Sequence, residues 1–182
     1  MNDLEILRTA FVAFLDGLWW GLRDNVGPLS MYEGYEGGFR QLGIELADQI
    51  GGSGPEEAAG IASEIMNAMG LETEARGTEV FVRKCPIWNR IKERGLEFAF
   101  HVEEICWKPM LEGIGEKTAT TPKVITSLRL NHIAMSKITY KKSKAKTAFE
   151  NGNLSQDEFD KEMAKLSSEE SKIPQAGQYK FE

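Results

Sequence analysis

The spacing of apolar residues changes once along this 182-residue chain, and that change constrains the fold more than any other feature. Residues 2–23, about 29–50 and 53–70 place apolar side chains at helical intervals. Beyond them, the stretches LETEA, TEVFVRK and LEFAFHV alternate apolar with polar or small residues, as strands do. The order predicts three helices packed on a small, mostly antiparallel sheet, which is an α+β architecture.

Two short helices are expected to cross this sheet. PIWNRIKERG and CWKPMLEGIGEK each carry a proline in or near the first turn, where a helix tolerates it. PKVITSLRLNHI then returns to strand spacing. We therefore expect residues 1–133 to form one α+β domain.

The composition shifts at residue 134, and residues 134–170 predict a helical hairpin. Five lysines precede the first acidic residue of this segment, Glu150; they are Lys137, Lys141, Lys142, Lys144 and Lys146. LSQDEFDKEMAKL follows with a narrow apolar stripe and reads as the second helix. Residues 171–182 are polar and predict a flexible tail, although Tyr179 and Phe181 could dock on the domain.

Charge and hydropathy exclude some classes of function. The net charge of −6 and the isoelectric point near 5.2 argue against a nucleic-acid-binding protein that relies on a basic face. No apolar stretch is long and uninterrupted enough for a membrane span, and the N-terminus lacks the features of a signal peptide. We expect a cytoplasmic protein.

The predicted helix over residues 29–50 contains an unusual number of glycines, namely Gly34, Gly37, Gly38 and Gly43. Each costs roughly 1 kcal/mol relative to alanine in a helix interior. The usual reason for such glycines is the close approach of another backbone or of a ligand. This helix is therefore expected to border a neighbouring element or a bound molecule.

The two cysteines occupy similar positions in the predicted fold. Cys85 ends a strand before Pro86, and Cys106 lies where a later helix is expected to begin. A thiol at a helix N-terminus has its pKa lowered by the helix dipole, so the pair could bind one soft metal ion or oxidise together. They could equally be core residues, because free cysteine is among the most often buried residue types.

A tetrahedral metal site needs four ligands, and the chain has candidates beyond the cysteines. The candidate set is Cys85, Cys106 and His132, with His101, Glu103 or Glu104 as the fourth ligand. No GxSxG, P-loop, GxGxxG, HExxH or EF-hand motif occurs in the chain. The sequence thus predicts where a site would lie more clearly than what it would do.

The order of these pieces resembles the four-vinyl reductase domain, a small-molecule-binding module. LWWGLRDNVGPLSMYEGYEGGFRQLG is similar to its glycine-containing helical opening, and VFVRKCPIWNRIKERG and EICWKPMLEGI resemble its second half. The resemblance covers about residues 5–133. In that family's pattern three cysteines are associated with metal or ligand binding; Cys85 and Cys106 match the first two, the third is absent, and His132 lies approximately in its place.

The resemblance implies a ligand-binding or sensing protein that is dimeric through its N-terminal helices. It would hold an apolar or aromatic small molecule between the glycine-rich helix and the sheet, and zinc, iron or haem at the Cys/His set would tune that binding. The expected lining residues are Trp19, Tyr35, Phe39, Trp88 and Trp107.

Two alternatives stay open. Aminothiazoline-carboxylate hydrolase-like relatives of this group imply an enzyme in which Cys85 is nucleophile or metal ligand and His101 or His132 is the base that helps to open a small cyclic amide or thiazoline. ENGNLSQDEFDKEMAKL is similar to a short C-terminal oligomerisation module. That second likeness implies a structural assembly protein whose helical tail joins subunits.

Overall fold

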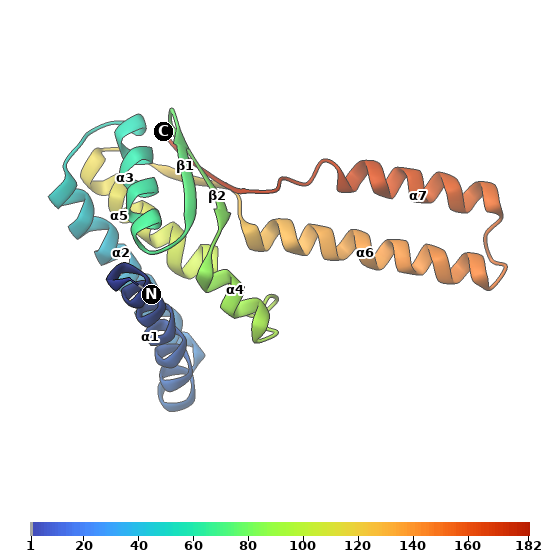
Figure 1. The fold of residues 1–182 in the computed structure, drawn as a ribbon, viewed down its shortest axis with the longest axis horizontal. Coiled ribbons are helices and arrows are strands. Elements are labelled where there is room, and N and C mark those ends of the chain that lie inside the picture. The colour runs from blue at the N-terminus through green and yellow to red at the C-terminus, as the bar shows by residue number, and fades with distance from the viewer. Residues whose placement is uncertain (1) are drawn as a thin grey trace. The chain divides into compact units, whose positions relative to one another are not determined.

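The computed structural model describes residues 2–182, and within them it contains seven α-helices, one π-helical segment and one four-stranded antiparallel sheet (Figure 1). The predicted α+β class is confirmed. The chain divides into two compact units, one that runs to Arg129 and includes Ala176–Glu182, and one that comprises Leu130–Gln175. The helices of residues 2–182 include none that is long and apolar enough to cross a membrane.

The first unit contains most of the secondary structure. Its opening helices are α1 (Asp3–Val26), α2 (Pro28–Ile50) and α3 (Pro55–Ala68). Its later helices are α4 (Pro86–Glu93), the π-helical segment η1 (Glu103–Trp107) and α5 (Lys108–Thr118). Its strands are β1 (Glu72–Arg76), β2 (Glu79–Lys84), β3 (Pro122–Thr126) and β4 (Gly177–Phe181).

Two glycines allow α2 and α5 to pack with their backbones in contact. A Cβ atom on Gly43 would lie 2.1 Å from the carbonyl oxygen of Met110, and one on Gly113 would lie 2.2 Å from that of Arg40. Neither separation is sterically possible, so both positions require glycine. Close backbone approach therefore explains Gly43, as predicted, whereas Gly37 and Gly38 face open space, with nothing within 4 Å of where a Cβ would be.

The sheet has the order β1-β2-β4-β3, so the C-terminal strand β4 lies inside it (Figure 1). Tyr179 of β4 is opposite Val80 of β2 and Val124 of β3, and both neighbouring strands are antiparallel to it. The prediction of a flexible tail over residues 171–182 is therefore wrong for Gly177–Phe181, although the expectation that its aromatic residues dock is confirmed.

Two stretches with strand-like alternation adopt other structures. Residues 96–102 form turns that lead into η1, and Phe100 of this segment is buried among aromatic rings. Residues 128–133 belong to α6 (Leu128–Glu150) and extend no strand. In both stretches tertiary packing overrides local β-propensity. The fourth strand of the sheet is β4 instead.

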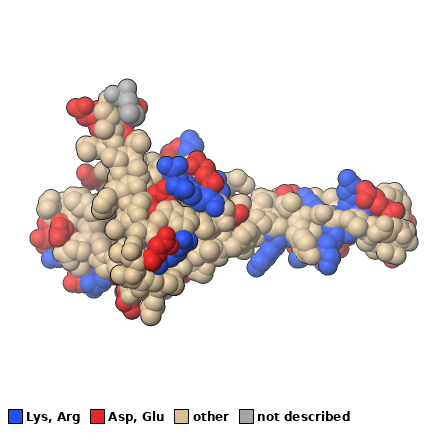
Figure 2. Space-filling view, turned by 90° about the horizontal axis from the view of Figure 1, so that it is seen from below, with Lys and Arg blue, Asp and Glu red and all other residues tan. Residues whose placement is uncertain are grey.

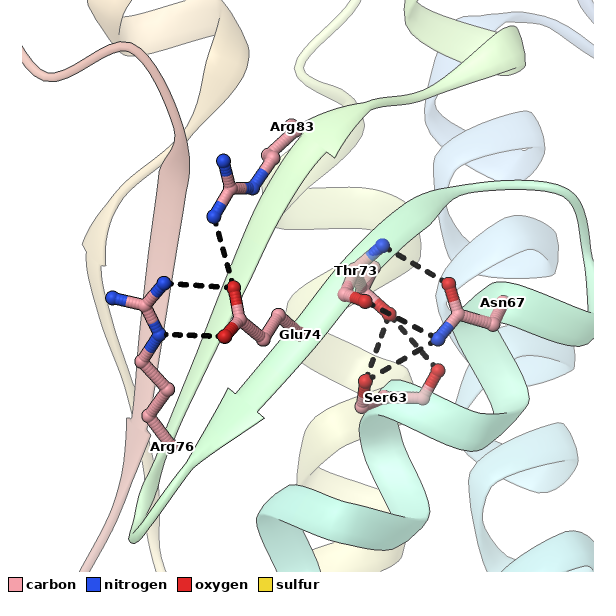
Figure 3. A network of polar contacts seen from close by, with 6 residues as sticks. All are labelled: Ser63, Asn67, Thr73, Glu74, Arg76 and Arg83. Carbon is pink, nitrogen blue, oxygen red and sulfur yellow. Dashed lines mark hydrogen bonds and ion pairs between the residues drawn. The ribbon is translucent and has the colours of Figure 1, made fainter.

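Polar side chains join α3 to β1 (Figure 3). The backbone N–H of Thr73 donates to Oδ1 of Asn67 at 3.0 Å, and its hydroxyl donates to the carbonyl oxygen of Ser63 at 3.0 Å. The next residue, Glu74, points to the other face of the strand and accepts hydrogen bonds from Arg76 and Arg83. These bonds, with Arg76 first, lower the pKa of Glu74 to about 2.

The second unit is a helical hairpin in which α6 and α7 (Gln156–Glu170) run antiparallel (Figure 1). The rings of Phe149 and Phe159 stack with their centroids 4.8 Å apart. Lys142 pairs with Glu170 at 2.5 Å, so acidic residues of α7 neutralise part of the basic face of α6.

Candidate functional site

An aromatic cluster occupies the core where α1, α2 and the π-helical segment meet. The ring centroids of Trp19 and Phe100 are 3.8 Å apart, and those of Phe39 and Trp107 are 5.6 Å apart. Tyr35 lies between them, stacked at 6.3 Å on Phe39 and edge-on at 5.9 Å to Trp19. Four of the five predicted lining residues therefore converge, and they pack together in the core. The fifth, Trp88, is buried on α4.

An open apolar groove lies beside this cluster, between α1 and α2. Its volume is about 240 Å³. It is lined by Phe11, Phe14, Leu15, Leu18, Leu22, Gly34, Tyr35, Gly38, Phe39 and Leu42. Of these, only Tyr35 carries a polar side-chain atom, and its hydroxyl donates to the carbonyl oxygen of Leu15.

Sequence reasoning placed the ligand between the glycine-rich helix and the sheet, whereas the groove lies between that helix and α1. The four-residue spacing of Gly34 and Gly38 was the available signal, because residues four apart share one face of a helix. Small residues on that face leave space where α1 passes. The same spacing did not reveal which helix would border the space.

A much smaller cavity of about 30 Å³ lies on the other side of α1, bordered by α4. Trp19 lines it, and within residues 2–182 its buried indole nitrogen has no hydrogen-bond partner. At its rim Asp16 pairs with Arg94 and lies 3.6 Å from the Nε of Arg90. The cavity has room for about one water molecule, which is too little for an organic ligand.

Both thiols are buried. Cys85 is the N-cap of α4, and its sulfur accepts the backbone N–H of Trp88 at 3.2 Å. Burial nevertheless raises the pKa of Cys85 to about 12, because desolvation outweighs the helix-terminal hydrogen bonds. Cys106 lies inside η1, which continues into α5, so it is not at a helix N-terminus. Burial, with Cys85 and Glu103 nearby, raises its pKa well above the usual value. The predicted lowering of the thiol pKa values is wrong.

We expect the native protein to resist thiol reagents. At pH 8 both thiols should stay protonated, and neither is accessible, with exposures of 1% for Cys85 and 0% for Cys106. Alkylation by iodoacetamide, followed by mass spectrometry, should modify neither cysteine within an hour and both within minutes in urea. Rapid labelling of the folded protein would contradict this burial.

The buried polar residues that sequence reasoning did not pair are Glu103 and Arg129. Glu103 is 0% and Arg129 is 7% exposed. The Nε of Arg129 donates to both carboxylate oxygens at 2.7 and 2.9 Å, and its Nη2 lies 2.6 Å from Oε1. Glu103 belongs to the π-helical segment. Its carboxylate, one of the predicted alternatives for a fourth metal ligand, is bound to Arg129 instead.

The geometry does not support the predicted metal set of Cys85, Cys106 and His132. Among residues 2–182 no group of three or more His, Cys, Asp or Glu side chains is placed to hold a metal ion. His132 belongs to the unit Leu130–Gln175, whereas both cysteines belong to the other unit. Of the possible fourth ligands, His101 is exposed and Glu104 lies 3.5 Å from the amine of Lys108. A metal or haem site thus stays a prediction.

Comparisons with known proteins add no relative. No family model matches the chain, and neither a curated protein nor a solved structure shows significant similarity to it.

Proposed function

We propose that this protein binds a small apolar molecule in the groove between α1 and α2. The observation that carries the proposal is the lining: about 240 Å³ of open space is bordered by apolar side chains and two glycines, with no charged group. The volume lies just below the range of roughly 300–1,000 Å³ that is usual for small-molecule sites. An uncharged aromatic or aliphatic molecule fits this chemistry.

Burial of apolar surface would drive the binding. Each Å² of apolar area removed from water contributes roughly 25 cal/mol, and the groove offers no ion pair as an alternative source of affinity. This site retains the glycine-rich helix that the resemblance to four-vinyl reductase domains implied, and it replaces the sheet with α1. Cys85 and Cys106 are outside the lining, so the proposal involves no thiol chemistry.

The hydrolase alternative is less well supported. A nucleophilic cysteine requires a thiolate that substrate can reach, whereas Cys85 is buried with its pKa raised to about 12. Its sulfur also accepts the hydrogen bond that caps α4. Its burial and this hydrogen bond favour a structural role for Cys85.

Filling the groove should weaken binding. A leucine at Gly38 would project into the groove, and we expect Gly38→Leu to weaken the binding of the neutral fluorophore N-phenylnaphthylamine by at least about tenfold, which corresponds to about 1.4 kcal/mol. Titration followed by probe fluorescence measures this effect.

The neighbouring residue supplies a matched control. Gly37 is also in α2 and also has nothing within 4 Å of where a Cβ would be, but it lies outside the groove. Gly37→Leu should therefore bind the probe as the unaltered protein does. Equal effects of the two substitutions, or no probe binding to the unaltered protein, would disprove the proposed site.

A second candidate function is assembly. It is favoured by the exposure of large apolar residues on α1, where Leu7 is 66% and Phe14 is 65% exposed. Contiguous apolar surface of this kind commonly marks a protein–protein interface. We propose a homodimer on this ground, with the N-terminal helices at its interface.

A further inference from the structure

Large apolar side chains recur along one face of α1 at intervals of three and four residues, as in a coiled coil. We name this set the α1 seam; it comprises Leu4, Leu7, Phe11, Phe14 and Leu18. Leu4 is 48% and Leu18 is 37% exposed, in addition to the two residues given above. In Figure 2 the N-terminal part of α1 projects from the body as a largely tan column with acidic residues near its end. The seam is thus an apolar surface that the described part of the chain leaves open.

The pattern of the seam indicates what would cover it. A strip of alternating three- and four-residue spacing is complementary to another helix that carries the same strip, because side chains of each fill the gaps of the other. A second copy of the chain supplies such a strip, and a two-fold axis brings identical surfaces together. Nothing lies within 4 Å of where a Cβ would be at Gly17 or Gly21, so a second helix has room to approach there.

The seam and the groove share residues. Phe11, Phe14 and Leu18 belong to both, whereas Leu7 belongs only to the seam. A helix laid on the seam would therefore also cover the outer side of the groove, opposite the floor formed by Gly34 and Gly38. In the single chain the groove is open on this side.

We propose that a second copy of this chain packs its α1 on the α1 seam and closes the apolar groove, so that ligand binding and dimerisation are coupled. The inference rests on the proposed ligand site. A ligand enclosed by both copies buries more apolar surface than one bound to a single copy, so the dimer binds it more tightly. By linkage, it must strengthen the dimer by the same factor by which dimerisation strengthens its own binding.

Two aspartate substitutions on α1 test the interface in the full chain. Leu7→Asp places a charge on the seam outside the groove, and it should weaken the dimer measured by sedimentation by about a hundredfold or more. Ala13→Asp, at an exposed position of the same helix outside the seam, should leave the dimer unchanged. In addition, Phe14→Cys should be cross-linked between copies by a short bis-maleimide, whereas Ala13→Cys should not.

The coupling is tested with N-phenylnaphthylamine. A saturating concentration should tighten the dimer of the unaltered protein by about tenfold, and Leu7→Asp, as a monomer at the same protein concentration, should bind the probe about tenfold more weakly. A monomeric protein at high concentration, or equal cross-linking at both cysteine positions, would overturn the interface. Probe binding of equal strength to the unaltered protein and to Leu7→Asp would overturn the coupling while the groove stands. A dimer that binds no probe would overturn both the proposed function and the coupling. The proposed dimer interface would not be affected by that result.

Discussion

Deletion of residues 176–182 is expected to unfold the α+β unit. The deletion removes β4, which pairs with both β2 and β3, and would leave these two strands without their shared neighbour. It also removes Tyr179 and Phe181, which are 2% and 1% exposed. Loss of one large buried aromatic side chain costs roughly 3–5 kcal/mol. Two such losses, added to the broken strand pairing, approach or exceed a total stability of about 5–15 kcal/mol.

Circular dichroism and urea denaturation provide the measurement. The shortened chain should show no cooperative unfolding transition and should expose its thiols to alkylation. A cooperative transition with the midpoint of the full chain would show that β4 contributes little.

The matched control removes far more residues from the same half of the chain. β3 and β4 are antiparallel neighbours, with Thr126 opposite Gln178, so the segment between them leaves and rejoins the sheet at adjacent positions. Replacement of residues 130–175 by a short glycine- and asparagine-containing turn should preserve the cooperative transition. Tests of the hairpin in assembly should use this internal deletion, since a C-terminal truncation that removes α7 also removes β4.

The helices and strands that could be predicted from the sequence are those determined by residues close to one another in the chain. Asn2 and Glu5 begin α1 with reciprocal hydrogen bonds of 2.9 and 2.8 Å, and Ser155 and Glu158 begin α7 in the same way. Strand β4 was not predicted because it is short, follows a polar segment and gains its stability from strands β2 and β3, which lie far earlier in the chain. Residues 96–102 were expected to form a strand but do not. Phe100 of this segment instead packs against the rings of Trp19 and Tyr35, which are distant in sequence.

In the candidate site, too, local patterns predict some features, whereas others depend on tertiary packing. The aromatic residues expected at the glycine-rich helix do converge there, because apolar periodicity identifies core faces. The space that a ligand could use depends on how α1 lies across Gly34 and Gly38, which no local pattern specifies. Likewise, helix position alone suggested a reactive Cys85, whereas the pKa of its thiol is set by burial, a property of the whole fold.

Arg129→Met is expected to destabilise the α+β unit by about 3–5 kcal/mol, because it would leave the carboxylate of Glu103 buried without its partner. Methionine retains much of the unbranched aliphatic stem, so packing changes less than charge. Urea denaturation should show a lower midpoint with an unchanged slope.

The double variant separates the net contribution of the pair from the cost of breaking it. Replacing both residues, as Glu103→Met with Arg129→Met, removes both buried charges, and apolar replacements of buried pairs are often neutral or stabilising. We expect the double variant to recover most of the loss, with a coupling of about 2 kcal/mol or more in a double-mutant cycle. A single variant that costs less than about 1 kcal/mol would mean that water reaches Glu103 in solution. Full additivity of the two substitutions would mean that the residues do not interact.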